Sequence, residues 1–157
     1  MIIHPIPPLF SNESQTLILG SFPSVKSREA EFFYGHPQNR FWTVVAKIYR
    51  QEKPLSVDDK KKLILENNLA LWDVIESCEI EGSADSTISN VTANDLSIII
   101  SNSKVDRIFV NGKTAEKYYN KYTYPKTGIK AICLPSTSPA NAAWSIDRLV
   151  EAWKIIK

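Results

Sequence analysis

The sequence has little cysteine, histidine or glycine, and each shortage excludes a class of site. Its 157 residues include two cysteines, two histidines and five glycines. Cys78 and Cys133 are too few for a disulfide scaffold or an all-cysteine cluster, so we expect two reduced thiols that are mostly buried. With only His4 and His36 to add as ligands, the sequence predicts no metal centre and no cofactor.

The motifs of several common enzyme classes are also missing. The chain has no phosphate-binding Gly-x-x-x-x-Gly-Lys loop, dinucleotide glycine fingerprint, His-x-x-x-His metal pair or Gly-x-Ser-x-Gly turn. What remains is a site built from amides, hydroxyls, aromatic rings and backbone N–H groups. Such a site suits polar recognition and electrostatic stabilisation better than strong acid–base catalysis.

Long apolar stretches are absent too. No apolar run approaches the ~20 residues that a membrane-spanning helix needs, and the first ten residues lack the pattern of a signal peptide. Hydrophobic residues make up 43% and charged residues 23% of the chain, which is the balance of a globular protein. We therefore expect one domain over residues 1–157, and a monomeric, cytoplasmic protein with no membrane contact.

Charge is unevenly distributed along the chain. The net charge is +2, but residues 1–100 carry −4 and residues 101–157 carry +6. A polyanion would therefore meet the C-terminal third first, with help from Lys26, Arg28 and Arg40. The alternative is that the lysines of the C-terminal third only form a solvated helix face.

Apolar patterns predict strands that alternate with helices. Buried strands are expected at residues 16–20, 69–72, 105–110 and 130–134, and helices at 39–49, 57–67, 94–101, and from about 114 and 145. The stretches 21–38, 77–92 and 135–144 are expected to be loops. Four strands separated by helices predict an α/β fold, a three-layer α/β/α sandwich with a central four-stranded parallel sheet.

Two of these loops are the best candidates for a ligand site. Ligands of parallel sheets bind at the carboxyl ends of the strands, and residues 21–38 and 135–144 both follow a predicted strand directly. We therefore expect the two loops to lie side by side. Asn39, at the end of the first loop, would by itself most often be a helix N-cap.

Three segments taken together resemble a known family. The ten residues FYGHPQNRFW at Phe33–Trp42 closely resemble the region after the first active-site loop of mismatch-specific uracil-DNA glycosylases. GSFPS at Gly20–Ser24 lies where that family has Gly-x-Asn-Pro-Gly, and LPSTSPAN at Leu134–Asn141 lies where it has its wedge loop. The resemblance covers nearly the whole chain and implies a uracil-DNA glycosylase-like fold.

One departure points to a neighbouring family. Phe22 stands where the uracil enzymes have a water-positioning asparagine, and a phenylalanine cannot position water. A GSFPS loop combined with Asn39 in the ten-residue block is similar to the hypoxanthine-DNA glycosylase family of the uracil-DNA glycosylase superfamily. That resemblance implies a monofunctional enzyme that hydrolyses the N-glycosidic bond of deoxyinosine after base flipping and so initiates base excision repair.

The resemblance also implies roles for individual residues. It makes Asn39 the catalytic residue and Tyr34 the aromatic platform for a flipped base. Ser21 and Phe22 are expected to contact the base, and His36 makes either a polar contact there or only a hydrogen bond within its loop. Contacts to the DNA backbone and a wedge in the base stack are expected from Pro23, Ser24, Ser136, Ser138, Pro139, Ala140 and Asn141. The partner implied is DNA that contains a damaged or deaminated base.

Two other functions fit the same residues. The nearest is a mismatch-specific uracil or thymine glycosylase that uses the same pocket, against which Phe22 argues. The other is a non-catalytic nucleic-acid- or nucleotide-binding module in which Asn39 only caps its helix.

Overall fold

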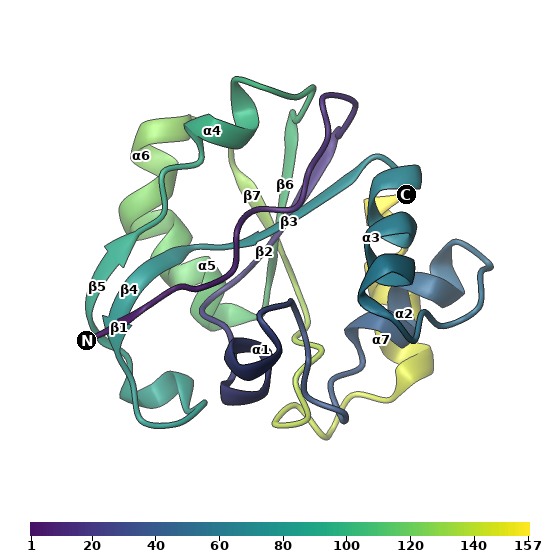
Figure 1. The fold of residues 1–157 in the computed structure, drawn as a ribbon, viewed down its shortest axis with the longest axis horizontal. Helices are drawn as coiled ribbons and strands as arrows, with labels where there is room; N and C mark the ends of the chain where they lie inside the picture. The colour runs from purple at the N-terminus through teal and green to yellow at the C-terminus, as the bar shows by residue number, and fades with distance from the viewer.

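A four-stranded parallel sheet lies at the centre of the computed structural model, which describes all residues 1–157 (Figure 1). Its strands are β2 (Thr16–Gly20), β3 (Leu69–Asp73), β6 (Arg107–Asn111) and β7 (Ala131–Leu134). They pair in the order β3-β2-β6-β7, and every pair is parallel. The predicted number and direction of strands are confirmed.

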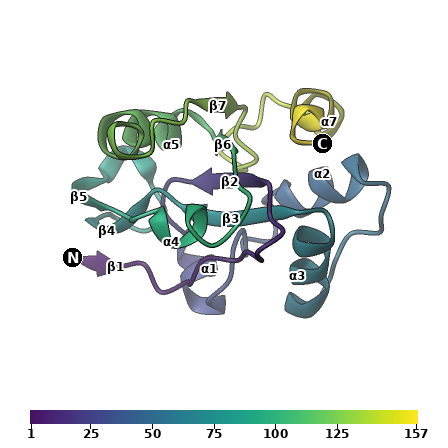
Figure 2. The same cartoon turned by 90° about the horizontal axis from the view of Figure 1, so that it is seen from above.

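Helices cover both faces of this sheet, as Figures 1 and 2 show. One face carries α2 (Phe41–Ile48), α3 (Val57–Glu66) and α7 (Ile146–Trp153), and the other carries α4 (Ser97–Ile100), α5 (Lys113–Tyr118) and α6 (Tyr124–Thr127). A π-helical turn (Tyr119–Thr123) joins α5 to α6, and a 3-10 turn (Lys154–Ile156) ends the chain. The predicted three-layer α/β/α architecture is confirmed.

Strand β2 shows why the two layers of helices hold together. All five of its residues are buried. Ile18 packs into the core beneath α2, α3 and α7, whereas Leu17 and Leu19 pack into the core on the opposite face. Because successive side chains of a strand point to opposite faces, one apolar strand supplies both cores.

The helix α2 starts two residues later than the sequence suggests, at Phe41 in place of Asn39. The helix α3 follows the prediction closely, and the Ser56 hydroxyl accepts a hydrogen bond from the Asp59 backbone N–H at 3.1 Å. In α7, Leu149 and Trp153 are buried as expected, while Ile146 is only half-buried.

The prediction of an exposed loop at residues 77–92 is wrong. That stretch holds most of two antiparallel strands, β4 (Ile75–Glu79) and β5 (Ser89–Ala93), joined through a 3-10 turn at Asp85–Thr87. The strand β1 (Ile2–Ile3) completes this small sheet on β4. The β4–β5 pairing shifts register twice, so apolar residues do not alternate regularly and the sequence pattern is lost.

The expected loop at residues 21–38 contains a short helix, α1 (Val25–Ala30), capped by Ser24. Six residues are too few to form an apolar stripe, so periodicity did not reveal it. Cys78 is buried and Cys133 half-buried, and both thiols are free, as predicted. No helix has the length and apolar character needed to cross a membrane.

Trp42 belongs to the core beneath α2, α3 and α7, and its substitution tests how tightly that core is packed. Its side chain is 3% exposed, and the indole N–H donates to the Phe33 carbonyl at 3.1 Å. We expect Trp42→Ala to lower the free energy of unfolding by about 3–5 kcal/mol, as truncation of a core aromatic does. Urea unfolding measures this. Leu55→Ala, at a side chain that is 86% exposed, is the control and should change stability by less than about 0.5 kcal/mol.

Candidate active site

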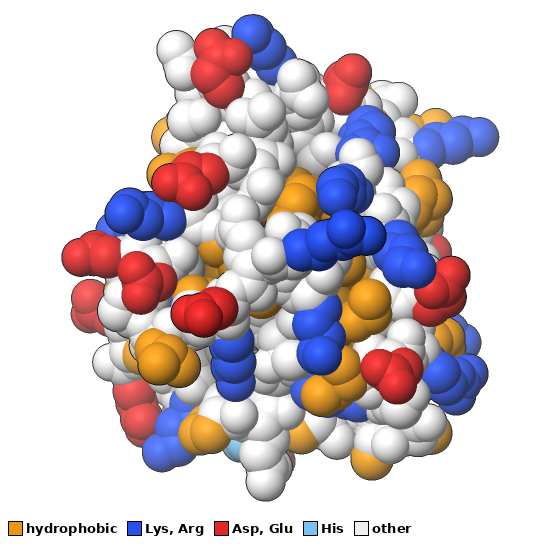
Figure 3. Space-filling view, turned by 90° about the vertical axis from the view of Figure 1, so that its right-hand side faces the viewer, with side chains coloured by type: hydrophobic (Ala, Val, Ile, Leu, Met, Phe, Trp, Pro, Cys, Tyr) orange, Lys and Arg blue, Asp and Glu red, His pale blue; other side chains and the backbone are white.

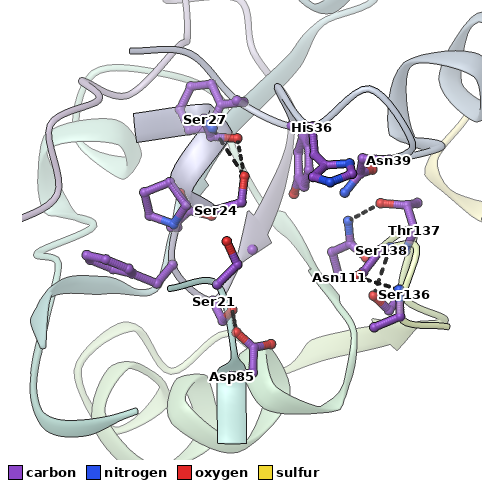
Figure 4. Close-up of a pocket in the computed structure, with 18 of the residues that line it drawn as sticks. Ser21, Ser24, Ser27, His36, Asn39, Asp85, Asn111, Ser136, Thr137 and Ser138 are labelled. Atoms are coloured by element: carbon purple, nitrogen blue, oxygen red, sulfur yellow. Dashed lines mark hydrogen bonds between the residues drawn. The ribbon is translucent and has the colours of Figure 1, made fainter. Parts of the chain in front are cut away.

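A cavity opens where the parallel strands end. Gly20, Asp73 and Asn111 are the last residues of β2, β3 and β6, and all three line it, together with residues that follow β7. The cavity volume is about 340 Å³. Figure 4 shows the GSFPS segment and α1 on one side of the cavity and the loop after β7 on the other. The two loops predicted to be neighbours are therefore neighbours.

The cavity brings together almost all of the residues singled out from the sequence. Every one of them except Asn141 lines its wall; those present are Ser21, Phe22, Pro23, Ser24, Tyr34, His36, Asn39, Ser136, Ser138, Pro139 and Ala140. Asn141 faces an adjoining hollow, and its amide donates to the Ser136 carbonyl at 3.0 Å.

Asn39 both shapes the start of α2 and faces the cavity. Its side-chain Oδ1 accepts a hydrogen bond from the Phe41 backbone N–H at 2.9 Å, and its backbone N–H donates to the His36 carbonyl at 2.9 Å. A carbonyl oxygen has two lone pairs and an amide has two N–H donors. The side chain therefore keeps one acceptor site and both donors for a ligand. The turn therefore uses only one lone pair of Oδ1 and leaves the other groups available for a catalytic role.

His36 lies beside Asn39 at the cavity wall (Figure 4). Its Nδ1 accepts from the Gln38 backbone N–H at 3.1 Å. His36 therefore makes a hydrogen bond within its loop and also lines the cavity, so the geometry is compatible with both roles considered for it. With Nδ1 used as an acceptor, a neutral ring carries its hydrogen on Nε2 and is a donor there.

Tyr34 is held in an unusual backbone conformation with φ of 51°. Its ring stacks on Phe41, with ring centroids 4.0 Å apart. The hydroxyl is buried and has no hydrogen-bond partner. Burial, and to a lesser degree the neighbouring Asp73 carboxylate, raises the pKa of the Tyr34 hydroxyl, so it remains an O–H donor at neutral pH.

The serines of the first loop are already partly used by the fold. The Ser24 hydroxyl accepts from the Ser27 N–H and donates to the Ser27 Oγ, both at 3.1 Å. The Ser21 hydroxyl donates to Asp85 at 3.2 Å. Desolvation raises the pKa of the Asp85 carboxyl, while hydrogen bonds from Ser21 and Thr114 oppose that shift. A phosphate contact by Ser24 therefore requires its hydroxyl to turn away from Ser27.

Phe22 forms a fixed wall of the cavity. It is 8% exposed and meets the His4 ring edge-on with centroids 5.9 Å apart, and the Arg28 guanidinium lies 5.6 Å from the centre of the Phe22 ring. A rigid apolar side chain at this position limits the shape of any base that enters.

Arg40 has a different role from the one expected from its charge. Its guanidinium donates to the carbonyls of Ser138 and Asn141, each at 3.0 Å, and to that of Trp144. Its backbone N–H donates to the Thr137 carbonyl at 3.1 Å. Arg40 therefore anchors the loop after β7 to the start of α2, and that its charge also helps to attract a polyanion stays a prediction.

Sequence reasoning missed three residues at the floor of the cavity, Asp73, Asn111 and Thr137. The Asn111 Oδ1 accepts from the Thr137 N–H at 3.1 Å, and its Nδ2 donates to the Thr137 hydroxyl at 3.0 Å. Asp73 pairs with His4, whose Nε2 lies 2.7 Å from the carboxylate. Asp73 and Asn111 directly follow the predicted strands at 69–72 and 105–110, so the rule that placed the loops could also have found them.

Basic side chains follow one outer face of the molecule. Figure 3 shows Lys and Arg along the face formed by α2, α3 and α7, above the end at which a histidine is visible. Exposed members on these elements are Lys47, Lys61, Lys62, Arg148 and Lys154. Lys113, from the basic C-terminal third, lines the hollow beside the cavity. That these charges meet nucleic acid stays a prediction.

Comparison with known proteins makes this α/β protein an enzyme of the DNA glycosylase class. The family model described as the Uracil DNA glycosylase superfamily matches residues 7–157, and the chain belongs to that superfamily. It is 32% identical to a Hypoxanthine DNA glycosylase of Methanosarcina acetivorans, over 99% of this chain and 98% of that protein.

Two further matches agree. The chain is 29% identical to a Hypoxanthine DNA glycosylase of Methanosarcina barkeri, over 71% of this chain and 72% of that protein. A solution NMR structure from Methanosarcina acetivorans, described provisionally as a uracil DNA glycosylase, superposes with a TM-score of 0.82 at 30% identity and covers 99% of both chains.

Arg40 allows the anchoring of the loop after β7 to be tested. We expect Arg40→Met to lower the free energy of unfolding by about 1.5–3 kcal/mol, because three partly buried carbonyls lose a charged donor. The loop amides of residues 137–144 should also exchange hydrogen faster. Urea unfolding and hydrogen exchange measure the two effects. Arg50→Met, at an exposed arginine just past α2, should change neither.

Proposed function

We propose that this protein is a monofunctional DNA glycosylase that hydrolyses the N-glycosidic bond of deoxyinosine and releases hypoxanthine. The observation that carries the proposal is the Asn39 amide, which faces the same cavity as Tyr34 and Phe22 and keeps free donors and a free acceptor site. The two relatives named Hypoxanthine DNA glycosylase support the choice of base.

In the proposed reaction Asn39 positions the nucleophile. Its carbonyl oxygen accepts a hydrogen bond from a water beneath the sugar, and that water forms a bond to C1′. The bond from C1′ to N9 breaks, its electron pair leaves with the purine, and the base takes up a proton equivalent to the one the water loses. Positive charge grows on the sugar and negative charge on the base, so the Asn39 N–H donors stabilise the departing purine.

The base must leave the duplex before it can reach the cavity. Extruding a nucleotide costs a few kcal/mol, and less for a mispaired base. Hypoxanthine is deaminated adenine and pairs poorly with thymine. Stacking on an aromatic ring returns roughly 1–3 kcal/mol per base, which is the role proposed for Tyr34. Phe22 then limits the shape of the base from its side of the cavity, while Ser21 and His36 offer polar contacts.

The remaining predicted residues are proposed to hold the DNA strand. Backbone N–H groups and hydroxyls of the Ser21–Ser24 loop, Ser136 and Ser138 are suited to phosphates. Pro139 and Ala140, which line the cavity, and Asn141, which lines the adjoining hollow, would fill the space that the flipped base leaves. We further propose that the enzyme acts as a single domain and a monomer in the cytoplasm, without a cofactor.

Excision assays with Asn39 variants test the proposal. Labelled duplexes that carry one deoxyinosine, one deoxyuridine or one G·T mismatch are incubated with excess enzyme and cleaved by alkali. We expect the fastest cleavage on deoxyinosine and a loss of several orders of magnitude in Asn39→Ala, where each tenfold equals ~1.4 kcal/mol of barrier. Loss of the turn alone should lower stability by about 0.5–2 kcal/mol and leave the folded enzyme active.

Asn39→Asp is the matched control for that experiment. Aspartate can still accept the Phe41 N–H and hold a water, but it cannot donate to the departing base. It should therefore be about as stable as the wild type and clearly slower on deoxyinosine. Wild-type cleavage of deoxyuridine or G·T alone favours the mismatch-specific enzyme, and no cleavage at all favours a binding module. Near-normal rates in folded Asn39→Ala contradict the catalytic role.

Variants of Tyr34 distinguish a role in stacking on the flipped base from a role in packing against Phe41. We expect Tyr34→Phe to excise deoxyinosine at close to the wild-type rate, because it keeps the ring that would stack on the base. Tyr34→Ala should be about tenfold to a hundredfold slower. It should also lose some stability, because the ring packs on Phe41 at 4.0 Å. Single-turnover rates measured well below the melting temperature separate slower excision from lower stability. Equal rates in the wild type, Tyr34→Phe and Tyr34→Ala contradict the stacking role.

A further inference from the structure

Beneath the cavity lies a buried pair, His4 and Asp73, that the proposed reaction does not use. Their side chains are 2% and 6% exposed, and the His4 Nε2 lies 2.7 Å from the Asp73 Oδ2. The partners are 69 residues apart in the chain, so the fold brings the N-terminal segment back to the end of β3. An ionisable pair buried this deeply at the floor of a ligand cavity suggests a function.

The direction of this hydrogen bond is fixed by the backbone. The His4 Nδ1 accepts from the Ile6 N–H at 3.1 Å, so a neutral ring carries its hydrogen on Nε2. That hydrogen is donated to the Asp73 Oδ2. The Asp73 carboxylate is therefore held by one oxygen, while Oδ1 receives no hydrogen bond from the protein.

The free oxygen, Oδ1, lies over the end of β2. A Cβ atom on Gly20 would come within 2.4 Å of this oxygen and 3.2 Å of the Tyr34 hydroxyl oxygen. The missing side chain of Gly20 thus leaves room for both groups beside the cavity. The Tyr34 hydroxyl is itself a buried donor without a partner. The Asp73 Oδ1, on a residue that lines the cavity, is therefore an acceptor that no protein group uses and that is available to a ligand.

We infer that the Asp73 Oδ1, oriented by His4, accepts the imino N–H of the flipped base and so selects hypoxanthine over adenine. This rests on the proposed function and adds a specificity-determining residue to it. Hypoxanthine presents N1–H as a donor beside the O6 carbonyl. Adenine presents N1 as an acceptor beside an amino group, the opposite pattern. A carboxylate repels the adenine N1 lone pair and so disfavours the excision of undamaged adenine.

Asp73→Asn reverses the polarity of this contact without changing its shape. His4 can only donate from Nε2, so the new amide turns its oxygen toward His4 and its NH₂ toward the cavity. The floor then offers a donor where it had an acceptor. Matched duplexes carrying deoxyinosine or deoxynebularine, whose N1 bears a lone pair, report the change. We expect the ratio of their single-turnover excision rates to shift toward deoxynebularine by about 100-fold.

Both rates are measured with the same protein on matched duplexes. Their ratio therefore does not change when part of the protein is unfolded or when the affinity for DNA falls. Asp58→Asn, at an exposed residue in the first turn of α3, is the matched control and should leave the ratio unchanged. If Asp73→Asn does not fold, 1-methyldeoxyinosine supplies the test in the wild type. A methyl group on N1 should slow excision by about 100-fold, and excision at the deoxyinosine rate overturns the inference.

The outcomes also separate the inference from the proposed function. Wild-type excision of deoxyinosine with an unchanged ratio in folded Asp73→Asn overturns the role of Asp73 and leaves the proposed function standing. Wild-type excision of deoxyuridine in place of deoxyinosine overturns the proposed base. Uracil also carries an imino N–H, so the inference then requires Asp73→Asn to excise deoxyuridine more slowly by a similar factor. Excision of deoxyuridine at the wild-type rate by this variant overturns the inference. No excision of either base overturns both.

Discussion

The site depends on four parallel strands that end level with one another. Gly20 pairs with Asp73 across β2 and β3, and Asn111 pairs with Leu134 across β6 and β7. Each strand therefore delivers its last residue, or the loop after it, to the same edge of the sheet. The backbone ladder is rigid, so these groups are positioned without spending a ligand's binding energy on ordering them.

The loop that carries Asn39, the candidate catalytic residue, is not part of this sheet, and hydrogen bonds from Arg40 hold it in position. This residue follows Asn39 directly and binds three carbonyls of the loop after β7. The candidate catalytic amide and the proposed wedge are therefore held by adjacent residues of one chain segment. A displacement of the wedge by DNA would be transmitted to Asn39 through this contact, which gives a physical route from DNA binding to alignment of the reactive water.

The predictions from sequence succeeded where the signal was local or carried by a rule of topology. The apolar runs found the four parallel strands, and the strand-end rule brought the loops after β2 and β7 together. The small sheet was missed because two register shifts interrupt the alternation in β4. The His4–Asp73 pair was missed because no local pattern joins residues 69 positions apart, and the carbonyl contacts of Arg40 were missed because a charge alone says nothing about its partners.

Asp73 and Asn39 would have opposite electrostatic effects on the departing base. Negative charge grows on the purine as its bond to the sugar breaks, so a carboxylate at Asp73 opposes the reaction while it favours the correct base. Two features reduce that conflict: the His4 N–H withdraws charge from Oδ2, and the base bonds to Oδ1 through its pyrimidine ring, away from N9. Asn39, a neutral donor, would then stabilise the charge where it develops. Selection and catalysis are thus assigned to different edges of the same base, a division that sacrifices some rate for discrimination against adenine.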